Sequence, residues 1–208
     1  MAGSTPGRAE GVLAALPLKP FTAAKGRLDG LLGPGARASL ARATAERVAA
    51  ACREAGAHTA VVTADPAVGR WCEELGLEVI TEPPGGGLNG AAVTAAAEAG
   101  RRGLAWCIVH ADLPLLTAAG VAAVAGAAGP GRAALAPSHD GGTNLFAAAC
   151  PLDFAYGPGS FARHLTVAGH LQVRVVVTVG TSLDIDGPED LRRAAALPGG
   201  AWLRPYLA

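Results

Sequence analysis

The stretch "LAWCIVHADLPLL", from Leu104 to Leu116, decides the fold. It opens with a short apolar run of the length of one buried strand, well below the roughly 20 residues that cross a bilayer. Asp112 follows at the carboxyl end of this strand, and Pro114 prevents the strand from continuing. We therefore expect a central buried strand that presents a carboxylate at its end.

On both sides of this stretch, apolar runs alternate with helical patterns. Strands are expected at 11–17, 58–65, 77–82, 104–112, 132–138, 144–150 and 171–179, and helices at 33–56, 66–76, 89–103, 117–129, 160–170 and 188–197. Asn89 is the expected N-cap of the third helix. The alternation predicts one α/β domain over 11–208, with a Rossmann-like, mixed but mostly parallel sheet flanked by helices. The short strands after residue 131 predict an antiparallel edge, and 1–10 are expected to be a disordered tail.

The composition narrows the class of partner. The chain has 208 residues, 50% hydrophobic and 16% charged, with a formal net charge of +0. This balance argues against nucleic acid or a membrane surface as partner. Four cysteines without a C-x-x-C pair, and no apolar leader at the N-terminus, indicate a reduced cytoplasmic protein. The segment "GGAWLRPYLA" (199–208) is expected to pack on the domain or on another subunit, which leaves a homo-oligomer open.

A basic loop follows the first strand. The segment "PLKPFTAAKGRL" (17–28) carries Lys19, Lys25 and Arg27. Open α/β sheets bind ligands beyond the carboxyl ends of their strands, so three cations here favour nucleotide phosphates over the alternative of a solvated loop. The loop has neither the G-x-x-x-x-G-K-[ST] nor the G-x-G-x-x-G pattern, which excludes the P-loop and dinucleotide fingerprints.

Two further carboxylates lie near the C-terminus. Asp184 and Asp186 are two apart in "TSLDIDGPEDL" (181–191), and in an extended segment they point the same way. They repel each other unless a cation lies between them, and with Asp112 they predict a three-carboxylate Mg²⁺ site. The alternatives are that Asp112 caps a turn, and that Asp186 caps the last helix while Asp184 is solvated.

Glycine-rich segments complete the candidate site. In "PPGGGLNGA" (83–91), Gly86, Gly87 and Asn89 lead into a helix and are expected to contact the nucleotide, because glycine lets backbone approach a ligand closely. Two more small-residue clusters, 140–144 and 157–160, flank an apolar stretch. The second opens a helix whose N-terminus favours an anion, unless Ser160 is only an N-cap.

Six motifs in this order resemble the CofC/FbiD family of guanylyltransferases in coenzyme F420 biosynthesis: "LPLKPFTAAKGRL", "GGLNGA", "ADLPLL", "DGGTN", "GPGSFARH" and "LDIDGPEDL". The resemblance spans Val12 to Leu191. It implies the nucleotide-diphosphosugar-transferase type of fold. It also implies transfer of GMP from GTP to phosphoenolpyruvate, which gives enolpyruvyl-diphospho-5′-guanosine and pyrophosphate.

The resemblance also implies roles for residues. Thr143, Gly157 and Ser160 would bind the phosphorylated acid, and Asp112, Asp184 and Asp186 would bind Mg²⁺. The three cations of the first loop would act in catalysis by holding the β- and γ-phosphates. Tyr156 stands where the family commonly has Phe, and an extra glycine precedes Thr143.

Several alternatives stay open on the sequence. The acceptor could be 2-phospho-L-lactate or 3-phosphoglycerate, and the enzyme could be a related nucleotidyltransferase that uses CTP or a molybdopterin acceptor. A nucleotide-binding regulator is the non-enzymatic alternative, against which the acceptor clusters argue. The unstable product of the phosphoenolpyruvate reaction implies hand-over to the next enzyme of the pathway.

Overall fold

The structure is a computed structural model that describes residues 11–207, so the tail expected at 1–10 lies outside the described residues. The strands are β1 (Val12–Pro17), β2 (His58–Thr63), β3 (Glu78–Thr81), β4 (Ala105–Val109), β5 (Arg132–Pro137), β6 (Thr143–Ala148) and β7 (Gln172–Val175). The α-helices are α1 (Pro34–Glu54), α2 (Pro66–Glu74), α3 (Gly87–Arg101), α4 (Ala118–Ala125), α5 (Ser160–Val167), α6 (Val179–Ser182) and α7 (Pro188–Ala196). Three 3₁₀ segments are η1 (Phe21–Ala23), η2 (Gly26–Leu28) and η3 (Ala201–Leu207).

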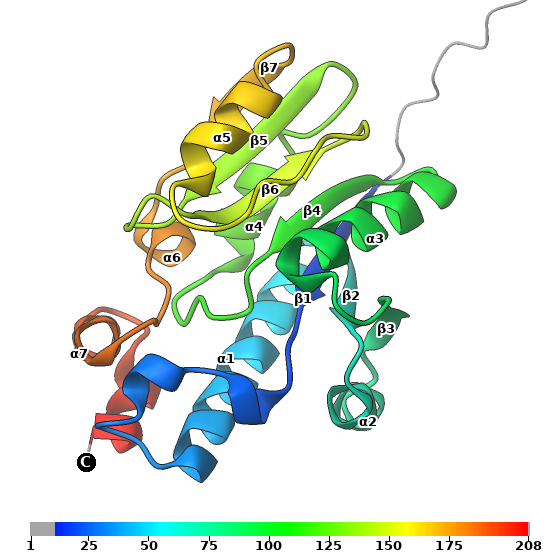
Figure 1. Ribbon diagram of the computed structural model, residues 1–208. Coiled ribbons are helices and arrows are strands. Elements are labelled where there is room, and N and C mark those ends of the chain that lie inside the picture. Colours follow the sequence, from blue (N-terminus) through cyan, green and yellow to red (C-terminus); the bar gives the residue numbers. More distant parts are fainter. Residues whose placement is uncertain (1–10, 208) are drawn as a thin grey trace, which may run out of the picture.

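The seven strands form one sheet in the order β3-β2-β1-β4-β6-β5-β7 (Figure 1). All neighbouring pairs are parallel except those of β6, which runs antiparallel to both β4 and β5. The mixed, mostly parallel sheet is therefore confirmed, but the antiparallel strand lies inside the sheet and not at its edge. The reason is local: the turn 138–142 folds β6 back between β5 and β4, and the connection through α5 then returns β7 parallel to β5.

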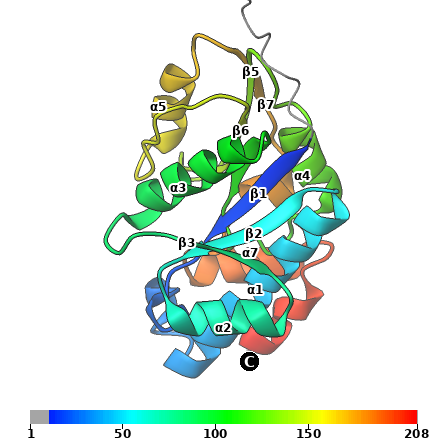
Figure 2. The same ribbon diagram turned by 90° about the vertical axis from the view of Figure 1, so that its right-hand side faces the viewer.

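Strand β4 is buried on both faces, as expected for the centre of such a sheet. Cys107 and Val109 face a core cluster shared with α1, α2 and α4, and Trp106 and Ile108 face a second cluster shared with α3. Figures 1 and 2 show α1 and α4 on one side of the sheet and α3 and α5 on the other. The sheet is thereby fixed between two helical layers, which leaves its strand ends to the loops.

The C-terminal segment packs on the body of the molecule, one of its two expected positions. Leu203 is buried in a third apolar cluster with residues of α7, the Arg47 guanidinium lies 4.4 Å from the Trp202 ring centroid, and the Tyr206 hydroxyl lies 3.1 Å from Ser39 Oγ. Within residues 11–207, every helix is too short or too polar to cross a membrane.

Candidate active site

The first loop folds back over the carboxyl ends of the central strands. Lys25, between η1 and η2, has a φ of 58°, and it is the one non-glycine residue between 11 and 207 with a positive φ. Such a backbone is uncommon for a side chain without special reason, and strain of this kind gathers at functional sites. Here it directs the ammonium inward, where Nζ donates to Asp112 Oδ2 at 3.0 Å and to the Ile185 carbonyl.

The three predicted carboxylates meet at this point. Asp112, Asp184 and Asp186 each offer an oxygen, and these oxygens all lie within 4.8 Å of one another. The segment that carries Asp184 and Asp186 is held against the end of β4, because the backbone N–H of Ile185 donates to the Asp112 carbonyl at 3.1 Å. Residues more than 70 positions apart in sequence are therefore brought into one acidic cluster.

The electrostatics of the cluster favour an added cation. Burial, and then the charges of Asp112 and Asp184, raise the pKa of Asp186, although Lys25 and Arg27 oppose them. Burial is the largest single influence on the pKa of Asp112 and would raise it, but the Lys25 ammonium and the charge of His110 together hold that pKa below its usual value. Lys25 thus neutralises part of the cluster, and Asp186 carries most of the remaining repulsion.

Asp184 and Asp112 each keep one carboxylate oxygen without a hydrogen bond from residues 11–207. Asp184 Oδ1 accepts from Ser138 Oγ at 2.7 Å and Asn144 Nδ2 at 3.2 Å, and His139 Nδ1 lies 3.4 Å away, while Oδ2 has no such contact among residues 11–207. Asp112 Oδ1 is buried and also lacks a hydrogen-bond partner within the described chain. Oxygen ligands held from behind suit a hard divalent cation, so the residues present fit such an ion.

The alternative for Asp186 and Asp184 does not describe the structure. The helix cap at α7 is supplied by Asp190, whose Oδ2 accepts from the backbone N–H groups of Asp186 and Gly187 at 3.1 and 2.8 Å. Asp186 is therefore free of that task. Asp184 is 7% exposed and is not solvated.

The other two cations of the first loop, Arg27 and Lys19, lie on either side of Lys25. Arg27 NH1 lies 3.0 Å from Asp186 Oδ2, with the arginine side chain 77% exposed. Lys19 lines the same cavity as Glu82, and its charge acts on that carboxyl. Arg27 thus joins the acidic cluster, whereas Lys19 lies toward β3.

A cavity of about 630 Å³ opens beside the acidic cluster, within the usual size of a small-molecule site. Its wall combines the first loop, the start of α3 and the ends of β1, β3 and β4. The lining residues include Lys19, Phe21, Lys25, Arg27, Glu82, Gly87, Leu88, His110, Asp112 and Asp186. Predicted phosphate-binding and metal-binding residues therefore share one cavity.

The glycine segment before α3 is placed somewhat differently from the prediction. The helix begins at Gly87 with Gly86 as its N-cap, so the expected start at Asn89 was wrong. Gly87 has a φ of 57° and lines the cavity, which only a residue without a side chain does at low cost. Asn89 lies inside the helix, and its Oδ1 accepts from the Tyr156 backbone N–H at 2.8 Å. It ties α3 to the loop before α5.

The two small-residue clusters of the expected acceptor site also meet. Thr143 Oγ1 lies 3.2 Å from Ser160 Oγ and 2.9 Å from His164 Nδ1, and all three side chains are buried. Gly159, not Ser160, is the N-cap of α5, and the Ser160 hydroxyl is directed to Thr143. The cap alternative for Ser160 is therefore wrong, and the hydroxyl belongs to a buried polar network.

His164, missing from the predicted site residues, fixes the protons in this network. Its Nε2 accepts the Ala155 backbone N–H at 2.9 Å, so a neutral ring carries its proton on Nδ1 and donates to Thr143. Burial, together with Arg163 and His110, lowers the His164 pKa to about 4, which keeps the ring neutral. The spacing "SFARH" was the available signal, since i and i+4 share a helix face.

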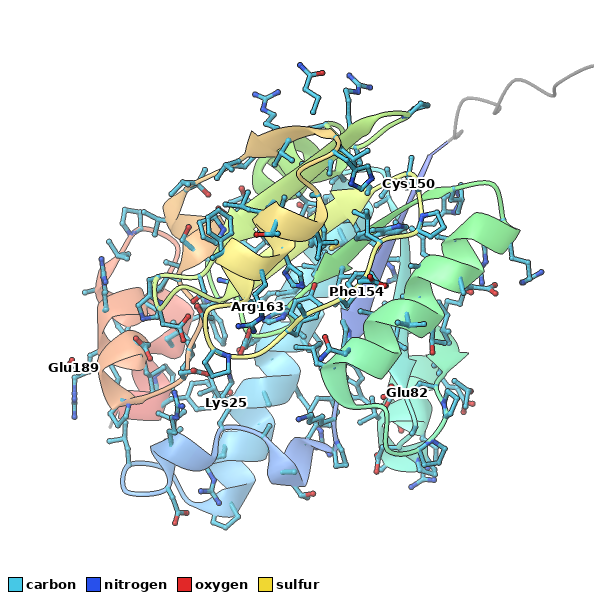
Figure 3. All side chains as sticks on the ribbon, turned by 45° about the horizontal axis from the view of Figure 1, so that its top comes forward. Lys25, Glu82, Cys150, Phe154, Arg163 and Glu189 are labelled. Carbon is cyan, nitrogen blue, oxygen red and sulfur yellow. The ribbon has the colours of Figure 1, made fainter. Side chains whose placement is uncertain are left out.

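The loop between the clusters is held by its own helix. Arg163 donates to the Ala155 carbonyl at 2.8 Å and to the Pro158 carbonyl at 2.7 Å (Figure 3). Gly157 between them has a φ of 126°, which an L side chain rarely adopts. Gly157, Thr143 and Ser160 lie outside the lining of the cavity, but the His110 ring, which lines it, is 5.4 Å from the Tyr156 ring. The two groups of predicted site residues are therefore neighbours.

Solved structures confirm the type of fold. A protein described as a nucleotide-diphospho-sugar transferase from Desulfovibrio desulfuricans matches with a TM-score of 0.70 at 15% identity, covering 93% of this chain and 94% of its own. The CTP complex of CMP:2-keto-3-deoxy-manno-octonic acid synthetase matches with a TM-score of 0.54 at 13% identity, over 92% and 100%. A Mycobacterium tuberculosis protein crystallised with manganese matches at 0.50 and 18% identity, over 89% and 97%.

Curated relatives are more similar in sequence. Phosphoenolpyruvate guanylyltransferase of Rubrobacter xylanophilus is 39% identical, over 95% of this chain and 99% of its own, and that of Streptomyces avermitilis is 38% identical, over 89% and 88%. The 2-phospho-L-lactate guanylyltransferase of Methanothermobacter thermautotrophicus is 30% identical, over 93% and 88%. The family described as guanylyl transferase CofC like matches residues 12–206. The chain is therefore a nucleotidyltransferase that belongs to the CofC-like guanylyl transferase family.

Proposed function

We propose that this protein transfers GMP from GTP to phosphoenolpyruvate in the presence of Mg²⁺, as a step of coenzyme F420 biosynthesis. A phosphate oxygen of the acceptor attacks the α-phosphorus of GTP, the bond to the β-phosphate oxygen breaks, and pyrophosphate leaves. The products are enolpyruvyl-diphospho-5′-guanosine and pyrophosphate. The observation that carries the proposal is the cluster of three aspartates and Lys25, of which Asp112, Asp186 and Lys25 line one nucleotide-sized cavity.

The acidic cluster and the first loop are suited to the triphosphate. Asp112, Asp184 and Asp186 would hold Mg²⁺, which supplies charge neutralisation for the phosphates when it is bound. Lys25 and Arg27 already lie against these carboxylates, so they can pass to phosphate oxygens that compete for the same contacts. Lys19 and Gly87 line the same cavity, where an ammonium and a bare backbone suit phosphates or ribose.

The buried hydroxyl network is suited to the acceptor. Thr143 Oγ1 lies between the donors Ser160 Oγ and His164 Nδ1, so its own proton stays available for a phosphate or carboxylate oxygen. The backbone N–H groups of Ser160 and Phe161 are paired with the Gly157 and Gly141 carbonyls, so the N-terminus of α5 favours an anion through its helix dipole. Thr143 and Ser160 are each 1% exposed, so contact with an acceptor requires the side chains and loop around them to shift.

No general base is assigned to the reaction, because the attacking phosphate is already an anion. The residues act by positioning and by charge, as in other phosphoryl-type transfers. Phosphoenolpyruvate is favoured over 2-phospho-L-lactate because relatives of 36–39% identity carry the former name, whereas the relative named for the latter is 30% identical.

The proposal is tested by pyrophosphate release from the purified protein with Mg²⁺. GTP with phosphoenolpyruvate is expected to give turnover, and GTP alone is not. Parallel reactions contain 2-phospho-L-lactate or 3-phosphoglycerate as acceptor, and CTP in place of GTP. Equal turnover with CTP, or no turnover with any phosphorylated acid, would overturn the assignment.

A further inference from the structure

Glu82 lies at the opposite end of the cavity from the acidic cluster. It follows the last residue of β3, where its backbone N–H donates to the Thr63 carbonyl at 3.2 Å. In the sheet order β3-β2-β1-β4, its strand is three spacings, or about 14 Å, from the strand that Asp112 follows. Figure 3 shows Glu82 beside the start of α3 and well separated from Lys25. Both residues line the same cavity.

The Glu82 carboxylate is not satisfied by the protein. Its Oε2 is buried and has no hydrogen-bond partner within residues 11–207. Burial raises the pKa of this carboxyl, and the charge of Lys19 only partly opposes the rise. A buried acceptor without a donor is costly and uncommon, and on the wall of a ligand cavity it indicates that a ligand supplies the donor.

The neighbours of Glu82 suit a flat ring. Leu18, Leu88 and Ala91 line the cavity with it and provide apolar surface. With the triphosphate at Lys25 and the aspartates, the nucleoside extends along the strand ends toward β3. The carboxylate is therefore placed at the base end of the nucleotide and not at its phosphates.

We infer that Glu82 selects guanine by accepting hydrogen bonds from the N1–H and the 2-amino group of the base, an inference that rests on the proposed use of GTP. Guanine carries two adjacent donors on this edge, and a carboxylate offers two adjacent acceptors. Adenine and cytosine each present a ring-nitrogen acceptor beside their amino donor, and that acceptor would face a carboxylate oxygen. Glu82 therefore favours GTP and rejects ATP and CTP through the same atoms.

The experiment measures nucleotide binding to the full-length protein by calorimetry with Mg²⁺ and no acceptor. Wild type is titrated with GTP, with ITP, which lacks the 2-amino group, and with XTP, which carries an oxygen in its place. Loss of one hydrogen bond to a charged group is worth ~10- to 150-fold in affinity, so ITP is expected to bind that much more weakly than GTP. XTP is expected to bind more weakly still, because its oxygen faces the carboxylate.

The variant Glu82→Gln reverses this order. Its amide presents one acceptor for N1–H and one donor, which matches xanthine and mismatches guanine, so XTP is expected to bind better than GTP. Glu82→Asp keeps the charge and is expected to keep the order GTP, ITP, XTP at lower affinity. Glu74→Gln, at an exposed position on α2, is the matched control and keeps wild-type affinities.

The other outcomes separate failure of this inference from failure of the proposed function. A uniform loss of affinity for all three nucleotides in Glu82→Gln would place the carboxylate on the ribose, and unchanged affinities would remove it from the site. Equal binding of GTP and ITP by wild type would overturn the inference without any variant. Selective GTP binding without pyrophosphate release from phosphoenolpyruvate would overturn the proposed acceptor and leave Glu82 in its role. Absence of GTP binding would overturn both.

Discussion

Lys25 Nζ lies 3.0 Å from Asp112 Oδ2, and the two side chains are 7% and 29% exposed. The ammonium also contacts the Ile185 carbonyl, between the two aspartates of the last motif. A strained backbone at Lys25 maintains this position. The lysine thus acts as an internal counter-ion at the acidic cluster, and it is placed to transfer to a phosphate when a nucleotide binds.

Replacement of Lys25 by methionine tests this role. Methionine keeps the length of the side chain and removes the charge, so the transition state loses a principal cation. We expect kcat for pyrophosphate release to fall by roughly 100-fold or more, the range for loss of one major electrostatic contact. Arg70→Met, at an exposed position on α2, is the control. Activity near wild type in Lys25→Met would show that the other loop cations suffice.

Asp112→Asn and Asp186→Asn are each expected to lower kcat by roughly 100-fold or more. Their effects on the stability of the metal-free protein are expected to be opposite. The raised pKa of Asp186 means that its ionised form weakens the native state, increasingly as pH rises through that pKa. Asp186→Asn removes this repulsion, so at pH 7 its melting temperature without metal should equal or exceed that of wild type.

Ionisation of Asp112 has the opposite effect on the stability of the fold. The pKa of Asp112 is lower in the folded chain than in the unfolded chain, so the ionised carboxylate stabilises the native state at pH values above its unfolded-state pKa. This stabilisation is lost as the pH falls through the folded-state pKa. Asp112→Asn removes the counter-ion of the Lys25 ammonium and leaves it the Ile185 carbonyl, at a cost of about 1–3 kcal/mol. Thermal melts with and without MgCl₂ check both variants, with exposed Asp153→Asn as control. A stabilisation by Mg²⁺ equal to wild type in either variant would place the ion elsewhere.

The acidic cluster could be predicted because each part of it is a local feature. An aspartate at the end of an apolar strand must lie at the carboxyl edge of a parallel sheet, and two aspartates at i and i+2 in an extended segment share a side. The basic loop is likewise fixed by its place after the first strand. These three inferences need no knowledge of which strands are neighbours.

The features of the fold and the site that the sequence did not predict depend on contacts between residues far apart in the chain. Strand β6 lies beside β4, and this brings Asn144 into hydrogen-bonding contact with Asp184. Strand patterns in the sequence do not predict this contact, because they do not determine the order of strands in the sheet. The left-handed backbone of Lys25 goes with contacts to Asp112 and Ile185, more than 80 positions away, which no local pattern shows. Asn89 was expected to begin a helix, but the helix begins at Gly87. The Asn89 side chain instead accepts a hydrogen bond from the Tyr156 backbone N–H, a contact between distant residues.

Ser160→Ala is expected to raise KM for phosphoenolpyruvate and to leave KM for GTP nearly unchanged. The Ser160 hydroxyl supports Thr143 and lies in the cluster assigned to the acceptor, outside the lining of the nucleotide cavity. One hydrogen bond to a charged group is worth ~1.5–3 kcal/mol, or ~10- to 150-fold in affinity. Initial rates against each substrate measure the two KM values. Since the hydroxyl is buried, a small fall in melting temperature is also expected, and such a fall with an unchanged acceptor KM would limit Ser160 to a structural role.

The variants His164→Asn and His164→Gln test the two hydrogen bonds of His164 one at a time. Asparagine places an N–H near the position of Nδ1 and keeps the donor to Thr143, whereas glutamine places its oxygen near Nε2 and keeps only the acceptor for Ala155. Both lose the ring contacts with Phe146 and Tyr156, so they share the packing loss. We expect His164→Gln to raise the acceptor KM by ~10-fold relative to His164→Asn, at equal KM for GTP. Equal acceptor KM values in the two variants would show that the histidine only packs.

His164 also gives the protein a specific loss of stability in acid. Its pKa is lowered from 6.5 to about 4, first by burial, so above pH 6.5 it is neutral in both the folded and the unfolded chain and contributes no pH dependence. As pH falls from 6.5 to 4, the unfolded chain binds a proton that the folded chain does not, and the free energy of unfolding declines by at most about 3 kcal/mol. His164→Asn cannot bind this proton, so the difference in unfolding free energy between wild type and His164→Asn should shrink over this interval. Urea unfolding at half-unit steps from pH 7.5 to 4.5 measures the difference, in which all other titrating groups cancel. A difference that stays constant with pH would show that the imidazole is not held neutral in the fold, and that its proton on Nδ1 is not what orients the Thr143 hydroxyl.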